Sequence, residues 1–147
     1  MSQENVELVR KFIAPGVGND YVQMFGDDDA WTAVKSSLEE LVEPDVEGAQ
    51  FAWGQQTNQW KGLEGLRKAF LEWLAPWSTY YDEIEDVLPV DGDRVLTLGH
   101  ERGLRRDSGI EVTSEMAGVY TVRDGKIVRI AFYATRAEAL AAAGLSE

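Results

Sequence analysis

The run from Arg94 to Ala134 constrains the fold more than any other part of the chain, because three strand-like segments follow one another there with only short turns between them. The segments are residues 94–106, 110–123 and 126–134, and the turns are 107–109 and 124–125. Asp-Gly between two β-rich segments is a strong hairpin signal, since both turn positions require positive φ. The run therefore predicts three consecutive antiparallel strands.

Counting outward from the two turns predicts how these strands pair. The turn at Asp124-Gly125 sets Ala117 opposite Phe132, and a turn centred on Asp107-Ser108 sets His100 opposite Glu115. Opposed side chains share a face of the sheet. One face is then expected to carry Leu98, His100, Arg102, Thr113, Glu115, Ala117, Val119, Ile130 and Phe132. The other is expected to carry Glu101, Ser114, Met116, Tyr120, Arg129 and Tyr133. A one-residue slip at the first turn would exchange the faces of the first strand.

The remaining segments predict mainly helices. The order expected for the whole chain is helix, helix, strand, helix, four strands, helix. Apolar residues recur at helical spacing after Ser2, after the acidic cap Asp27–Asp29, and from Gly62 onward. Residues 19–26 are too short and apolar to classify. A short strand from Val46, a polar loop over 54–58 and a strand over 78–90 are expected between the helices and the final strands. Thr135 and Glu138 form a capping box that predicts the last helix.

Composition narrows the class of protein. The 147 residues predict a single domain spanning 1–147. A formal net charge of −12 argues against binding nucleic acid or an anionic membrane surface. The absence of cysteine excludes disulfides, thiolate catalysis and zinc–thiolate sites. No apolar run reaches membrane-spanning length and the first residues lack a secretion signal, so a cytoplasmic protein is expected.

Several short motifs are shared with a known group of proteins. They are residues 1–10, Gly62–Arg67, Asp91–Val95, Asp124–Val128 and Phe132-Tyr133. With these motifs the chain resembles the nuclear transport factor two-like superfamily, and within it the SnoaL-like polyketide cyclase group. The resemblance implies an α+β fold, a cone-shaped α+β barrel in which a strongly curved, mainly antiparallel sheet wraps around three N-terminal helices, with a short C-terminal helix.

The same resemblance implies an apolar pocket inside the cone and a homodimer formed through the outer sheet face. Combined with the counted faces, it predicts that the side bearing Leu98, His100 and Phe132 is concave. The side bearing Tyr120 and Tyr133 is expected to form the dimer.

The site residues known for related enzymes fit this chain poorly. The acids that limonene epoxide hydrolases use correspond to Leu104 and Phe132, and the base of ketosteroid isomerases corresponds to a position near Trp53. The resemblance to SnoaL-like cyclases, which use an acid and a His, leaves His100 with Glu115 as the catalytic candidates.

In that hypothesis His100 is the general base, Glu115 orients its ring and Arg102 holds an enolate or carboxylate. The alternative is a ladder of polar cross-strand partners with no catalytic role. The residues expected to line a ligand pocket are Tyr21, Trp53, Trp60, Leu98, Ala117 and Phe132. No cofactor and no metal site are expected, since the acidic runs 27–29 and 82–86 lack calcium-loop spacing and are more typical of a solvated surface.

Three functions remain open at this point. The first is a protein that binds a small apolar molecule and has no complete catalytic set. The second is a cofactor-free cyclase, isomerase or hydrolase that uses His100 and Glu115 on a polyketide- or steroid-like substrate. The third is a dimeric scaffold whose cone is filled by side chains.

Overall fold

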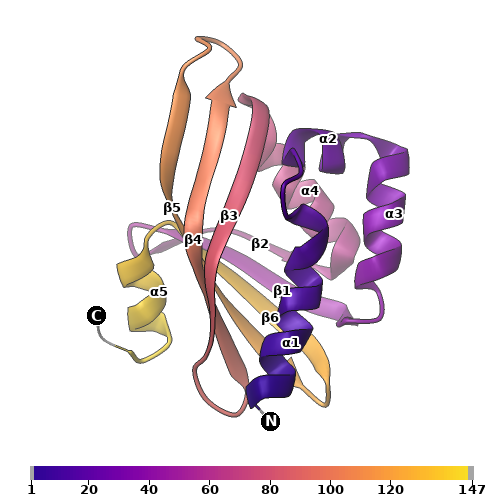
Figure 1. The fold of residues 1–147 in the computed structure, drawn as a ribbon, viewed down its shortest axis with the longest axis vertical. Coiled ribbons are helices and arrows are strands. Elements are labelled where there is room, and N and C mark those ends of the chain that lie inside the picture. Colours follow the sequence, from indigo (N-terminus) through magenta and orange to yellow (C-terminus); the bar gives the residue numbers. More distant parts are fainter. Residues whose placement is uncertain (1, 146–147) are drawn as a thin grey trace.

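A curved six-strand sheet separates two unequal layers of helices (Figure 1). The computed structural model describes residues 2–145. Four helices lie on one side of the sheet, while the last helix lies on the other side, against β5 and β6. The first group comprises α1 (Ser2–Ile13), α2 (Tyr21–Gly26), α3 (Asp28–Leu38) and α4 (Gly62–Leu74), with a 3-10 turn η1 (Ala14–Gly16) after α1. The last helix is α5 (Arg136–Ala142). We call the two sides of the sheet the inner face, toward α1–α4, and the outer face, toward α5.

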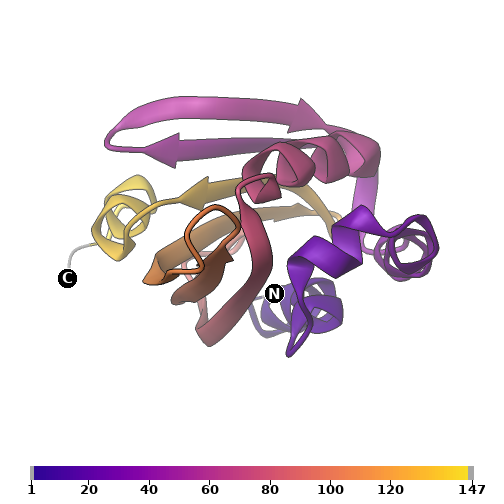
Figure 2. The same cartoon turned by 90° about the horizontal axis from the view of Figure 1, so that it is seen from above.

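The sheet is mainly antiparallel, as the sequence predicts. Its strands are β1 (Val42–Ala52), β2 (Gln55–Lys61), β3 (Trp77–Pro89), β4 (Arg94–Arg105), β5 (Glu111–Arg123) and β6 (Lys126–Tyr133). They lie in the order β2-β1-β6-β5-β4-β3, and only the β1–β6 pair is parallel. The view from above shows the β1–β2 hairpin at one edge of the sheet, beside α4 (Figure 2). None of the helices in residues 2–145 is long and apolar enough to cross a membrane.

The predicted loop over 54–58 is wrong for residues 55–58, because they belong to β2. The β1–β2 turn consists of Trp53 and Gly54, whose φ angles are 52° and 76°. This is the positive-φ geometry of a tight hairpin turn. Trp is uncommon at positive φ, so Trp53 did not indicate a tight turn in the sequence.

Capping side chains explain where α3 and α5 begin. The Asp27 carboxylate accepts a hydrogen bond from the Ala30 amide at 2.8 Å, and the Thr135 hydroxyl accepts one from the Glu138 amide at 3.1 Å. Each bond satisfies an amide that the first helical turn leaves unpaired. The caps predicted from the sequence for α3 and α5 are therefore confirmed.

The β4–β5 register is also confirmed, with His100 opposite Glu115 and Leu98 opposite Ala117. The β5–β6 register is wrong beyond the turn. Val122 pairs with Ile127, but Thr121 pairs with Arg129, so Val128 is an extra residue that forms a β-bulge. Phe132 consequently lies opposite Gly118 instead of Ala117.

The bulge reverses the predicted faces, because side chains alternate along a strand. Tyr120 pairs with Ile130 and is buried among the core residues of the inner face, which corrects its expected place on the outer face. Leu98 is on the outer face, where it packs with Ala139 and Leu140 of α5. His100 shares the strand parity of Leu98, so its predicted place on the concave face is wrong as well. Phe132 does lie on the concave face, as expected.

Gly99 allows β3 and β4 to approach closely on the inner face. A Cβ added there would overlap the backbone carbonyl oxygen of Glu83, which cannot move without disturbing the sheet. Gly92, in the β3–β4 turn, has no neighbouring atom within 4 Å of the same added atom. The two glycines thus form a matched pair for a packing test.

We expect Gly99→Ala to lower the free energy of unfolding by about 2 kcal/mol or more, because overpacking against backbone forces the strands apart. Gly92→Ala should change it by less than about 0.5 kcal/mol. Urea denaturation followed by circular dichroism measures both. Equal stability of the two variants would contradict the proposed close approach.

Candidate functional site

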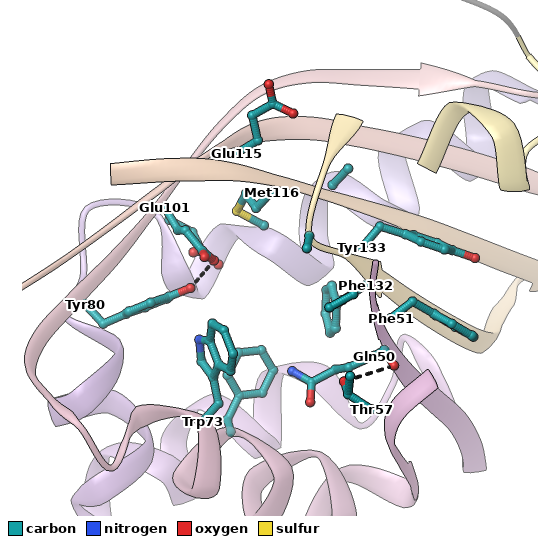
Figure 3. Close-up of a pocket in the computed structure, with 15 residues that line it drawn as sticks. Gln50, Phe51, Thr57, Trp73, Tyr80, Glu101, Glu115, Met116, Phe132 and Tyr133 are labelled. Atoms are coloured by element: carbon teal, nitrogen blue, oxygen red, sulfur yellow. Dashed lines mark hydrogen bonds between the residues drawn. The ribbon is translucent and has the colours of Figure 1, made fainter. Parts of the chain in front are cut away.

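A cavity of about 100 Å³ lies between α4 and the inner face of the sheet. Figure 3 shows that its walls are mostly apolar, with Trp73 on one side and Phe132 and Met116 on the others. Phe70 completes the apolar lining. One corner is polar, because Tyr80, Asp82 and Glu101 reach it from the neighbouring strands β3 and β4. The cavity is large enough for several water molecules or a small organic molecule.

A second, smaller cavity of about 50 Å³ adjoins the first. The two share Phe70, Asp82, Met116 and Phe132 as lining residues. The second one extends toward the N-terminal helices and includes Tyr21. Asp82 therefore borders both spaces.

The two carboxyl groups of the polar corner have different surroundings. Asp82 and Glu101 are directly paired across β3 and β4. Glu101 is held by two donors, since the Tyr80 hydroxyl donates to its Oε2 and the Ser114 hydroxyl donates to its Oε1 at 2.9 Å. Asp82 Oδ1 is buried and has no hydrogen-bond partner in residues 2–145. A buried carboxyl oxygen without a hydrogen-bond partner lowers the stability of the folded state, so its presence points to a functional role for this site.

Burial changes the proton affinity of both acids. Burial and, after it, the Glu101 charge raise the pKa of Asp82 to about 7, although interaction with the Tyr21 hydroxyl opposes the rise. Burial also raises the pKa of Glu101, while the hydrogen bonds from Tyr80 and Ser114 oppose this shift. The pKa of the Tyr80 hydroxyl is raised far above its ordinary value by burial and the two nearby carboxyls, so Tyr80 remains a hydrogen-bond donor.

Asp20 explains how the local sequence places Tyr21 and Tyr80 around these acids. Its Oδ1 accepts the Val22 amide at 3.0 Å, which caps α2, and also the Tyr80 amide at 3.0 Å, which ties α2 to β3. The rings of Tyr21 and Tyr80 are then 6.0 Å apart between centroids. Gly16 leaves room for the Tyr21 hydroxyl, which a Cβ at that position would overlap.

Residues of β5 and β6 also border the cavity. Glu115 is one of them, yet Figure 3 shows its side chain pointing away from the other lining residues, and its Oε1 accepts the Arg136 amide at 2.8 Å. Gln50 reaches the cavity from β1, with its amide extended toward Trp73 (Figure 3). That side-chain amide makes no hydrogen bond within the described part of the chain.

The catalytic residues predicted from the sequence are not assembled in this cavity. His100 lies on the outer face, where its Nδ1 is 2.5 Å from Glu85 Oε1 rather than in contact with Glu115. Arg102 is also outside the cavity, with its guanidinium 4.8 Å from the centre of the Tyr81 ring. The expectation that His100 and Arg102 face the pocket is thus wrong, because the bulge at Val128 places Phe132 on the opposite side from them.

The predicted lining residues divide into two groups. Phe132 and Ala117 border the main cavity, and Tyr21 borders the second one. Leu98 is buried under α5, so its assignment to the pocket is wrong. Trp53 is 87% exposed at the β1–β2 turn and lines neither cavity. Trp60 packs over Gly48 and against Phe132 and also lines neither of them.

Asp82, Glu101 and Tyr80 were missed as a site by the sequence reasoning. The run 82–86 is acidic and therefore resembles a solvated surface. The sequence does contain a signal for Asp82. Tyr80, Asp82 and Ile84 are alternate residues of one strand, so the Asp82 side chain lies on the same face as two apolar side chains. No group of three or more His, Asp or Glu side chains in residues 2–145 is arranged to hold a metal ion.

Comparison with known proteins identifies the fold. A family model described as SnoaL-like domain matches residues 19–130. No curated protein matches the chain. Among solved structures, a nuclear transport factor 2-like protein from Burkholderia thailandensis has a TM-score of 0.66 and 16% identity, with 95% of each chain covered.

Two further structures have named features. A hypothetical protein with a ketosteroid isomerase-like fold from Catenulispora acidiphila, solved in complex with trimethylamine, has a TM-score of 0.60 and 17% identity over 95% of this chain and 93% of that one. A candidate SnoaL-like polyketide cyclase from Jannaschia has a TM-score of 0.61 and 18% identity over 89% and 85%. At these identities the likeness establishes the cone fold alone, which confirms the predicted fold class.

The raised pKa of Asp82 predicts that the stability of the protein depends on pH. The folded state holds a proton on Asp82 up to about pH 7, whereas the unfolded chain releases it near 3.8. The contribution of this group to stability is therefore full below about pH 4 and is lost as the pH rises to about 7. Asp82→Asn removes the charge, so its stability relative to the wild type should increase by about 1 to 3 kcal/mol between pH 4 and pH 8.

Urea unfolding of both proteins at several pH values measures this difference. Asp86→Asn, on the same strand but at an exposed position, is the control. The difference in the free energy of unfolding between Asp86→Asn and the wild type should stay nearly constant from pH 4 to pH 8. An equally constant difference for Asp82→Asn would contradict the raised pKa.

Proposed function

The chain belongs to the SnoaL-like domain family, and on that premise we propose that it binds a small, mainly apolar molecule in the cavity beside α4 and exchanges a proton with it. Asp82 and Glu101 form the acid–base pair in this proposal, and no cofactor takes part. The observation that carries it is the buried Asp82 Oδ1, which borders the cavity and lacks a hydrogen-bond partner in the described residues.

The surroundings of the pair support distinct roles for its members. A general base works best when its pKa lies near the working pH, and the pKa of Asp82 is raised to about 7. Glu101 is fixed by Tyr80 and Ser114, so it is positioned to modulate Asp82 through its charge and to share the proton. The apolar walls lower the local dielectric constant, which strengthens electrostatic interactions inside the cavity.

The chemistry that fits is the transfer of a proton from a weakly acidic C–H group beside a carbonyl. Asp82 would accept the proton and the C–H electron pair would become part of an enolate. Return of the proton from Asp82 to another carbon of the enolate system completes an isomerisation. Alternatively, the enolate carbon attacks a second carbonyl group to form a C–C bond, and the oxygen of that group takes the proton from Asp82, which completes a cyclisation. The structures of similar fold described as a candidate polyketide cyclase and as a hypothetical protein in complex with trimethylamine support a ligand cavity in this fold.

The earlier pairing of His100 with Glu115 finds no geometric support as the acid–base set. His100 contacts Glu85, and Glu115, at the border of the cavity, accepts a hydrogen bond from the backbone amide of Arg136. A homodimer through the outer sheet face remains a proposal from the family resemblance, and α5 already covers part of that face near β5 and β6.

Hydrogen–deuterium exchange at the α-carbon of cyclopentanone tests the proposal, because this ketone is small and neutral. Nuclear magnetic resonance at neutral pD should show exchange faster than in buffer by about 100-fold or more at a saturating ketone concentration. The rate should rise with pH through about 7, since the acceptor must be ionised.

Asp82→Asn should return the exchange rate to the level of the buffer, whereas Asp86→Asn should keep the wild-type rate. Both variants are first checked for native circular dichroism. Exchange that persists in Asp82→Asn, or a wild-type protein that neither binds cyclopentanone nor accelerates exchange, would overturn the proposed function.

A further inference from the structure

We propose that the molecule taken by this cavity carries, besides the carbonyl group that the proposed function requires, a small aliphatic amino group bound as its ammonium ion. This inference rests on the proposed function and adds the chemical class of the ligand.

The charges that border the two cavities have one sign. Asp82 and Glu101 contribute carboxyl groups to the main cavity, and Asp82 also borders the second one. Neither cavity has a Lys, Arg or His among its described lining residues. Closely placed carboxylates without a basic partner create a negative potential, which a low-dielectric wall intensifies. An anionic ligand would have to enter against this potential.

The aromatic lining suits the same class of ligand. Tyr80, Trp73, Phe70 and Phe132 border the main cavity from α4, β3 and β6. Trp73 and Tyr80 meet edge to face at 6.5 Å between centroids, and Phe70 meets Phe132 in the same manner at 5.7 Å. Ring faces attract cations and tolerate the alkyl groups of an amine. Carboxylates beside such rings therefore form a site for a cation with an apolar body.

The unpaired oxygen gives the amine a specific partner. Asp82 Oδ1 accepts no hydrogen bond from residues 2–145, although it is buried. The groups that face Asp82 from other elements are Glu101 on β4, Tyr21 on α2 and Tyr120 on β5. None of them supplies a positive charge. An ammonium N–H would supply both the missing donor and the missing charge.

The proton balance is simple. When the Asp82–Glu101 pair holds one proton, a neutral amine accepts it through the nitrogen lone pair and becomes ammonium, which leaves two carboxylates. When the amine arrives already protonated, the pair releases its proton to solvent as the ammonium binds. Binding is accordingly coupled to proton release below about pH 7.

Isothermal titration calorimetry with four probes of similar shape tests the inference. The probes are tert-butylamine and tetramethylammonium as cations, tert-butanol as the neutral form and trimethylacetate as the anion. We expect both cations to bind at least about tenfold more tightly than tert-butanol, and trimethylacetate to bind more weakly than tert-butanol. The affinity for tetramethylammonium should fall by about tenfold between pH 8 and pH 5.5, because protons then compete for the pair.

Asp82→Asn should weaken the binding of both cations by about tenfold or more and leave tert-butanol within about twofold. Asp86→Asn removes the same charge from the exposed part of β3, so unchanged cation binding in that variant separates the local charge from the net charge. Glu101→Gln serves as a second variant if Asp82→Asn fails to fold, and it should weaken cation binding in the same direction.

Trimethylacetate that binds as tightly as tetramethylammonium, or cation binding unaffected in Asp82→Asn, would overturn the inference. If tert-butanol binds and cyclopentanone exchange is accelerated while both cations fail to bind, the charge inference fails and the proposed function stands. If no probe binds and no exchange is accelerated, both fail.

Discussion

The bulge at Val128 is the constraint on which the inside of this molecule depends. One extra residue in β6 shifts its pairing with β5, so that Ile130 and Phe132 join Tyr120 on the inner face. Without the bulge, Ile130 and Phe132 would lie on the outer face, under α5. The bulge thus supplies Phe132 as the wall that the two cavities share.

The acid pair lies on the same inner face and is costly to bury. Burial is the main reason why the pKa of Asp82 reaches about 7, and the charge of the neighbouring Glu101 adds to the rise. The fold offsets part of this cost for Glu101 through Tyr80 and Ser114, but leaves Asp82 Oδ1 unpaired. Residues retained in such an unfavourable state are typical of functional sites.

The remaining parts of the site hold this corner in place. Asp20 ties α2 to β3 through two backbone amides, so Tyr21 is brought against Asp82 from a part of the chain about sixty residues away. Phe70 and Trp73 close the space from α4. The polar corner, the apolar walls and the negative potential therefore arise from separate elements and meet only in the assembled cone.

Local sequence signals determined every helix except α2, the caps of α3 and α5, the two hairpin turns of the C-terminal strands and the β4–β5 register, because each depends on residues close in the chain. They also determined the fold class through motifs such as Asp124–Val128. Only the tertiary structure decided which face of the sheet is concave, and hence that Asp82 and Glu101 meet at the cavity whereas His100 lies outside it. A bulge has no distinctive residue type at Val128, and burial depends on the whole sheet, so neither could be counted from the turns.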